Sequence, residues 1–201
     1  MSLGRAAVVA RSWAMRLPHR LHLGRLVRSV PGLRMAHRPL MNWYLRLVKR
    51  AAPRLTEVEG HLIWVDPLDT LDLISKGTYE PFSVELATAR LQPGDVVVDI
   101  GANIGHHSLC FARAVGAEGR VYCFEPDPGN HALLQKNAQA NGYENVIAEQ
   151  KAVSDRTGTL RLYQSDENRG DHRIYDPRDG RASLDVATVR LDEYFADHDG
   201  P

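Results

Sequence analysis

The stretch "VVVDIGANIGHHS", residues 96–108, has the residue types and spacing of a ligand-binding loop. An apolar run contains one carboxylate, Asp99, and the chain then turns through Gly101 and Gly105 on either side of Asn103. In an open α/β sheet, ligands lie beyond the carboxyl ends of the strands, where a glycine-rich turn lets the backbone approach them closely. The first turn of a following helix presents unpaired N–H groups to the same place. The stretch therefore predicts a buried strand, a binding loop and a helix.

A second acid, Glu125, ends the next apolar run, where its carboxylate can accept hydrogen bonds from both hydroxyls of a ribose. The order D-x-G-x-x-x-G differs from the G-x-G-x-x-G of dinucleotide folds, whose helix start receives a pyrophosphate. A P-loop is excluded because no Gly-Lys-Ser/Thr follows Gly105. Asp99 would repel a phosphate but suits a cationic ligand. S-adenosylmethionine has an ammonium, a sulfonium and a ribose, without a phosphate, and matches this pattern of charge.

The elements around this loop alternate between strand and helix. The expected strands are 96–100, 120–127 and 145–155, and the expected helices are 107–119 and 128–142. This order is typical of a parallel sheet built from right-handed crossovers. Before it we expect a strand at 60–67 and a loop with a short helix at 74–95; after it, strands at 157–165 and 182–195, the latter running into a short helix, with a polar loop at 166–181.

The charge is distributed unevenly along the 201 residues. Residues 1–56 hold 12 of the 25 Lys and Arg and no acid, so the remainder is acidic. Such a basic arm could lie on an anionic membrane or bind nucleic acid, or have no specific ligand. The acidic body argues against broad phosphate binding, so we expect no nucleic-acid partner and at most a weak membrane-surface contact through the arm. No apolar stretch reaches the roughly 18 residues of a spanning helix.

The two cysteines, Cys110 and Cys123, fall within apolar patterns. They are expected to be buried free thiols in a reducing compartment, which suggests a cytoplasmic protein. His106 and His107 lie on the first turn of a predicted helix and are interpreted as packing or capping residues. No spacing predicts a metal site.

Taken together, the motifs resemble the FkbM-type family of class I S-adenosylmethionine-dependent methyltransferases. The resemblance covers about residues 60–195 and is carried by "ISKGTYEPF", "LQPGDVVVDIGANIGHHSL", "VYCFEPDPGNHALLQKN", "KAVSDRTGTLRLY", "NRGDHRIY" and "VRLDEY". It implies an α/β, Rossmann-like parallel sheet. Family members continue after "RLDEY" into further strands, whereas this sequence ends at "ADHDGP". We therefore expect a basic arm at 1–55 and, at 56–201, the N-terminal part of a truncated methyltransferase domain that supplies only the 3-2-1 side of the sheet.

The resemblance also implies which residues bind S-adenosylmethionine. Those assigned to its methionine side are Asp99, Gly101, Ala102, Asn103 and Gly105. Glu125 is assigned to the ribose, Pro126 and Asp127 lie beside the adenine, and Ala152, Val153 and Ser154 flank the adenine ring. Glu80, in "GTYEPF", would approach the cofactor ammonium.

The family implies methylation of a hydroxyl on a sugar, glycan or secondary metabolite. A hydroxyl acceptor must lose its proton, which favours a His or carboxylate within hydrogen-bond reach. His172 and Asp171, in "NRGDHRIY", are the predicted catalytic residues. Three alternatives stay open at this point: a non-catalytic remnant that binds a nucleoside, an NAD-dependent oxidoreductase that the glycine spacing disfavours, and a membrane- or nucleic-acid-binding protein that acts through its arm. The acceptor and the oligomeric state are not specified by the sequence.

Overall fold

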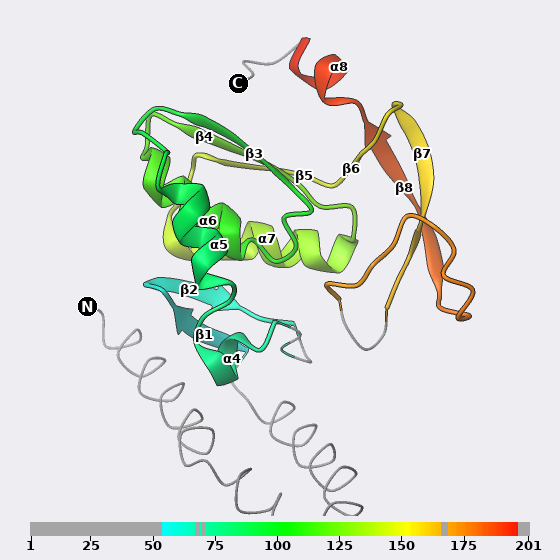
Figure 1. The fold of residues 1–201 in the computed structure, drawn as a ribbon, viewed down its shortest axis with the longest axis horizontal. Helices are drawn as coiled ribbons and strands as arrows, with labels where there is room; N and C mark the ends of the chain where they lie inside the picture. The colour runs from blue at the N-terminus through cyan, green and yellow to red at the C-terminus, as the bar shows by residue number, and fades with distance from the viewer. Residues whose placement is uncertain (1–53, 67–68, 70, 166–168, 197–201) are drawn as a thin grey trace, which may run out of the picture. The chain divides into compact units, whose positions relative to one another are not determined.

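The computed structural model describes residues 54–66, 69, 71–165 and 169–196. The basic arm predicted at 1–55 falls almost entirely outside these residues, so its boundary and role stay predictions. The described chain divides into two units, one made of residues before Glu80 and the other of His61–Trp64 together with the chain from Glu80 onward (Figure 1). Every predicted site residue belongs to the second unit. The described helices are all too short or too polar to span a bilayer.

The first unit contains a strand that the sequence pattern did not predict. This strand is β1 (Leu55–Val58), and the same unit holds the short helix α4 (Leu73–Lys76). Val65 N–H donates to the Arg54 carbonyl at 2.7 Å. The Asp69 carboxylate accepts a hydrogen bond of 3.1 Å from Ile74 N–H in the first turn of α4.

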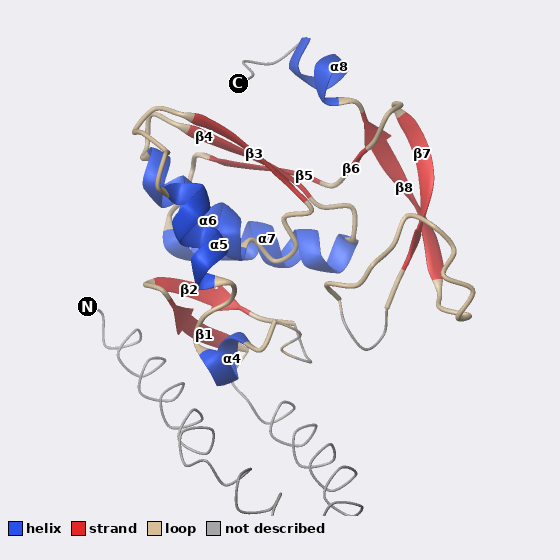
Figure 2. Cartoon of the chain, in the orientation of Figure 1, coloured by secondary structure: helices blue, strands red, loops and turns tan. Residues whose placement is uncertain are grey.

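A three-stranded parallel sheet forms the centre of the second unit (Figures 1 and 2). Its strands, in spatial order, are β3 (Val96–Ile100), β4 (Arg120–Phe124) and β5 (Val146–Glu149). The connecting helices are α6 (His106–Val115) and α7 (Pro128–Asn141). The predicted α/β class, the parallel pairing and the 3-2-1 strand order are confirmed.

Each face of this sheet has its own hydrophobic cluster. Toward α6 and α7 the buried members are Ala102, Ala112, Val115, Val121, Cys123 and Leu134. Toward α8 (Leu191–Ala196) they are Tyr122, Phe124, Val189 and Tyr194. Cys110 and Cys123 are both buried and free, as predicted, and burial raises the pKa of the Cys123 thiol to about 12.

The pattern at β3 predicted a buried strand, and this prediction is wrong. Its residues are only partly buried, and the side chain of Ile100 is 57% exposed. In the described part of the chain β4 is the only strand paired with β3. Apolar residues alone do not reveal whether a strand has one neighbour or two.

The strand predicted over 145–155 is two strands in different sheets. β5 ends at Glu149, and after two residues β6 (Ala152–Val153) begins a second sheet of order β6-β8-β7. β7 (Gly158–Tyr163) and β8 (Ser183–Val189) pair antiparallel, whereas β6 and β8 pair parallel. At the end of β5, the Glu149 carboxylate accepts hydrogen bonds from Tyr194 Oη at 3.0 Å and from Lys151 Nζ at 2.7 Å.

Side-chain amides of α7 hold the short strand β2 (His61–Trp64). Asn137 Oδ1 accepts from Trp64 N–H at 2.6 Å, while its Nδ2 donates to the Trp64 carbonyl at 3.1 Å and to the Ile104 carbonyl at 2.8 Å. Asn141 makes the corresponding pair of bonds to the peptide groups of Leu62, at 2.8 and 2.7 Å. The side-chain amides of Asn137 and Asn141 therefore make hydrogen bonds to β2 of the kind that the backbone of a neighbouring strand would make.

We expect Asn137→Leu to lower the free energy of unfolding by about 2–4 kcal/mol. The leucine has a similar volume but leaves three buried or part-buried backbone groups without these partners, each costing up to roughly 1–3 kcal/mol before relaxation. Urea unfolding measures the loss. Gln139→Leu, at an exposed position of the same helix, is the control and should stay within about 0.5 kcal/mol of the original chain. Equal stability of both variants would contradict the role given to Asn137.

Candidate functional site

The loop between β3 and α6 is fastened to the end of β4. Gly101 N–H and Ala102 N–H both donate to the Phe124 carbonyl, at 2.9 and 3.1 Å. Asn103 has a left-handed backbone, with φ of 53°, and its side-chain Oδ1 accepts from Ile104 N–H at 2.7 Å. These bonds hold the loop against the end of β4.

The two glycines of the loop have different surroundings. Gly101 has a φ of +77°, and a Cβ placed there would meet no heavy atom within 4 Å. Gly105 has a φ of +88°, but a Cβ there would lie 2.5 Å from Leu134 Cδ1 on α7. Gly101 thus leaves open space beside the backbone, as a ligand would require, whereas Gly105 lets α6 and α7 approach each other closely.

Glu125 connects this loop to the turn after β4. Its side chain is buried, with 5% exposed, and the two carboxylate oxygens accept from different backbone groups. Oε2 accepts from Asn103 N–H at 2.8 Å and Oε1 from Asp127 N–H at 2.9 Å. An ionised carboxylate has four lone pairs in all, so Glu125 retains acceptor capacity for a further donor such as a ribose hydroxyl.

Burial raises the pKa of Glu125 from its ordinary value of 4.5 to about 7, against the lowering effect of the hydrogen bonds from Asp127, Asn103 and Asn130. A raised carboxyl pKa means that the ionised form is disfavoured in the folded chain. The protonated carboxyl group of Glu125 therefore contributes to the stability of the folded chain. This contribution is fully present below pH 4.5 and is lost as the pH rises through about 7. It amounts to roughly 3 kcal/mol.

We therefore expect Glu125→Ala to flatten the pH dependence of unfolding. Between about pH 5 and pH 8 the original chain should lose about 2–3 kcal/mol more stability than the variant, because only the original chain buries this carboxyl group. Urea unfolding at both pH values measures the difference. The comparison uses the change of the unfolding free energy with pH. A constant loss of stability, caused by leaving Asn103 N–H and Asp127 N–H unpaired in the variant, therefore does not affect it. Parallel pH profiles would show that Glu125 titrates at its ordinary pKa.

Asp99 faces the same side of the sheet as Glu125. Val97 and Cys123 both pack into the cluster under α6 and α7, and side chains alternate along a strand, so Asp99 and Glu125 follow them to that side. Ser108 Oγ donates to Asp99 Oδ2 at 2.6 Å. Burial raises the pKa of Asp99, and the Ser108 hydrogen bond opposes this effect. The arrangement places both acids on one side, as the predicted pair requires.

Asp127 is almost completely enclosed by protein. It begins α7 as the N-cap, where Oδ1 accepts from Asn130 N–H at 2.9 Å. Oδ2 accepts from Gln164 Nε2 at 2.6 Å, and the side chain is only 2% exposed. The predicted place of Pro126 and Asp127 beside the adenine stays a prediction, and of the two only Pro126 is half-buried rather than buried. Gln164 and Asn130 were absent from the residues predicted for this site.

The two predicted catalytic residues have unequal surroundings. His172 Nδ1 accepts from Ser165 N–H at 3.0 Å, and its Nε2 lies 3.5 Å from Asp127 Oδ2. Burial lowers the pKa of His172, which favours the neutral ring. Asp171 pairs with Arg173 and Arg181, and the hydrogen bond from Arg173 is the largest cause of its lowered pKa. His172 could accept a substrate proton at Nδ1 only after losing the hydrogen bond from Ser165 N–H. Its catalytic role stays a prediction.

The remaining predicted cofactor residues lie at the ends of other elements. Ala152 and Val153 form β6, and Ser154 N–H donates to the Val189 carbonyl at 3.0 Å. Glu80 precedes α5 (Pro81–Thr88), is exposed, and has a left-handed φ of 47°. Such a backbone is uncommon outside glycine and is enriched at functional sites. Its approach to a ligand ammonium stays a prediction.

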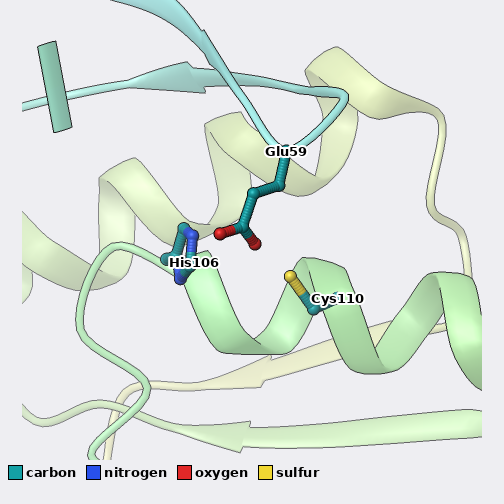
Figure 3. Close-up of side chains that lie close together, drawn as sticks. All are labelled: Glu59, His106 and Cys110. Carbon is teal, nitrogen blue, oxygen red and sulfur yellow. The ribbon is translucent and has the colours of Figure 1, made fainter. Parts of the chain in front are cut away.

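His106 and Cys110 lie one turn apart on α6 (Figure 3). Both are buried, and their ligand atoms lie within 4.8 Å of each other. The His106 ring packs edge-on against His107, with 5.4 Å between ring centroids. The interpretation of the two histidines as packing or capping residues stays a prediction.

Comparison with known proteins gives matches in the same part of the chain. The family model "Methyltransferase FkbM domain" matches residues 99–201. The 31-O-demethyl-FK506 methyltransferase FkbM of Streptomyces tacrolimicus is 43% identical over 73 residues, which are 36% of this chain and 27% of that protein. The protein-L-isoaspartate O-methyltransferase of Ignicoccus hospitalis is 33% identical over 89 residues, which are 43% of this chain and 41% of that protein.

Among solved structures, a SAM-dependent O-methyltransferase from Thermotoga maritima aligns with a TM-score of 0.36 and 20% identity, covering 50% of this chain and 41% of that one. The chain spans 27% to 41% of the length of the two curated relatives named above. The family match covers slightly more than half of the chain. The chain belongs to the methyltransferase FkbM domain family.

Proposed function

We propose that this chain is the cofactor-binding part of an S-adenosylmethionine-dependent methyltransferase that methylates a hydroxyl on a sugar, glycan or secondary metabolite. The observation that carries the proposal is the buried carboxylate of Glu125. It lies at the tip of a parallel strand and accepts hydrogen bonds from the glycine loop and from the turn after β4. The carboxylate keeps acceptor capacity for a ribose hydroxyl, at the place where α/β sheets bind nucleosides.

Two further features of the structure fit this cofactor. The open space beside Gly101 allows a ligand to contact the backbone. Asn130 Oδ1 is buried and has no hydrogen-bond partner among the described residues, so a nucleoside donor would satisfy it. S-adenosylmethionine supplies a methyl group already activated by its sulfonium. The contribution of the chain is then to hold and orient the ligand, with Asp99 and Glu80 favouring its positive charge.

Methylation at an oxygen atom is supported by the two relatives named above, since both are named as O-methyltransferases or act at an oxygen position. His172 and Asp171 are our candidates for handling the hydroxyl proton. We propose no nucleic-acid partner and only a weak membrane-surface contact through the basic arm. The two buried free thiols support a cytoplasmic location.

Calorimetric titration of the purified chain with S-adenosylhomocysteine and, separately, with NAD tests the proposal. Binding of the homocysteine compound alone is the expected result, whereas binding of NAD alone would favour an oxidoreductase and overturn it. A second assay follows methyl transfer from S-adenosylmethionine to a panel of hydroxylated sugars and macrolides. Binding without transfer to any acceptor would support the other function predicted from the sequence, a nucleoside-binding remnant.

A further inference from the structure

Gln164 reaches the nucleoside site from the second sheet. It directly follows β7, and its backbone N–H donates to the Ala182 carbonyl at 2.8 Å. The preceding residue, Tyr163, exchanges backbone hydrogen bonds of 2.7 and 3.0 Å with Arg173. The backbone at Gln164 is therefore held on both sides, while its side-chain amide donates to Asp127 at 2.6 Å, across 37 positions of sequence.

This contact begins a continuous series of hydrogen bonds that ends in the glycine loop. Gln164 Nε2 donates to the Asp127 carboxylate, and Asp127 N–H donates to Glu125 Oε1 at 2.9 Å. Glu125 Oε2 accepts in turn from Asn103 N–H at 2.8 Å. The orientation of the Glu125 carboxylate thus depends on the turn after β4, and that turn is held in part by Gln164.

The surroundings of Asp127 leave its carboxylate little freedom to turn elsewhere. Oδ1 is held by the N-cap bond to α7, and a Cβ on Gly129 would meet Arg169 Nη1 at 2.4 Å, so the guanidinium covers the start of the helix. His172 closes the remaining side, with Nε2 3.5 Å from Oδ2. Gln164 makes the shortest of these contacts, and its amide is neutral, so its effect on the turn is one of orientation rather than charge.

We propose that Gln164 is a positioning residue of the nucleoside site, which sets the orientation of the Glu125 carboxylate toward the ribose through Asp127. The proposal rests on the proposed function, because it requires Glu125 to bind a ribose. It predicts a specific signature. Loss of the Gln164 amide should weaken recognition of the ribose hydroxyls and leave the rest of the ligand bound as before.

The test compares S-adenosylhomocysteine with its 2′,3′-dideoxyribose analogue, by calorimetry on the full chain. Gln164→Met keeps the side-chain length and removes the donor. We expect it to weaken binding of S-adenosylhomocysteine about tenfold and binding of the analogue less than about twofold. Gln139→Met, at an exposed position of α7, is the matched control and should change neither affinity. Equal losses for the two ligands, or no loss for either, would overturn the proposal.

Exchanging the amide and the carboxylate between positions 164 and 127 keeps the total charge and tests whether the lost affinity can be restored. Gln164→Glu places a carboxylate against Asp127 and should weaken S-adenosylhomocysteine binding at least as much as Gln164→Met. Adding Asp127→Asn should restore most of the lost affinity, because the new amide can donate to the new carboxylate while its oxygen still caps α7. Failure of this rescue in a double variant that unfolds like the original chain would also overturn the proposal. If the original chain binds no S-adenosylhomocysteine, the proposed function itself fails, which is a distinct result.

Discussion

Gly105→Ala is expected to lower the free energy of unfolding by about 2–5 kcal/mol. The left-handed backbone, with φ of +88°, costs an L-residue roughly 1–2 kcal/mol. The new Cβ would lie 2.5 Å from Leu134 Cδ1, and Leu134 is fully buried in the cluster under α6 and α7, so its side chain must shift against the residues packed around it. Overpacking of this kind adds about 1–3 kcal/mol. Chemical denaturation measures the total.

Gly101→Ala is the matched control, because it has a similar φ of +77° and no heavy atom within 4 Å of the added Cβ. Its loss of stability should be limited to the backbone term of about 1–2 kcal/mol. Its effect on S-adenosylhomocysteine binding should be the larger one, since the added methyl group enters the space proposed for the ligand. Gly105 would then be required for folding and Gly101 for binding, although both belong to one sequence motif.

The steric part of this prediction can be isolated with Leu134→Ala. Alone, that change should cost about 2–5 kcal/mol through the cavity it leaves. Combined with Gly105→Ala, it should cost less than the sum of the two single variants, because the added Cβ then has room. Strict additivity would show that the strain at residue 105 lies entirely in the backbone.

The residues around the glycine loop could be predicted from sequence because their pattern is local. An apolar run that carries Asp99 and leads into Gly101 is enough to predict a strand end and a turn, and Glu125 at the end of the next run follows by the same reasoning. Carboxyl ends of parallel strands share one edge, so placing the two acids at the same edge needed no information from distant contacts. Both observed strands end within one residue of the predicted acid.

The contacts that sequence reasoning missed are distant or depend on neighbours. Gln164 meets Asp127 across 37 positions, and nothing in "LYQSD" distinguishes it from a surface residue. β5 ends at Glu149, whose carboxylate accepts a hydrogen bond from Tyr194, 45 positions away. Within residues 96–108, the contact of Ser108 with Asp99 could have been predicted from the sequence. A hydroxyl on the first turns of the helix after an acidic strand end can reach back to the acid, and here it does so at 2.6 Å.

Glu125→Ala should weaken binding of S-adenosylhomocysteine ten- to a hundredfold. A carboxylate that accepts hydrogen bonds from ribose hydroxyls contributes roughly 1.5–3 kcal/mol. Calorimetry at a fixed pH measures the loss. Glu149→Ala is a sharp control, because Glu149 also ends a strand of the same sheet but bonds to Tyr194 on the opposite face. Its affinity should stay within about twofold of the original chain, so that a general effect of removing a strand-end acid is separated from ribose binding.

The pH dependence of binding gives an independent check on the same residue. Burial raises the pKa of Glu125 to about 7, and the ionised form is the better acceptor for two hydroxyls. The affinity of the original chain should therefore rise as the pH rises through about 7, which is opposite in sign to the contribution of Glu125 to stability. Ligand binding and unfolding would then depend on one proton in opposite directions, and Glu125→Ala should abolish both dependences. If the affinity of the variant still rises through the same pH range, another group causes the pH dependence of binding. That result would contradict the role given to Glu125 at the ribose.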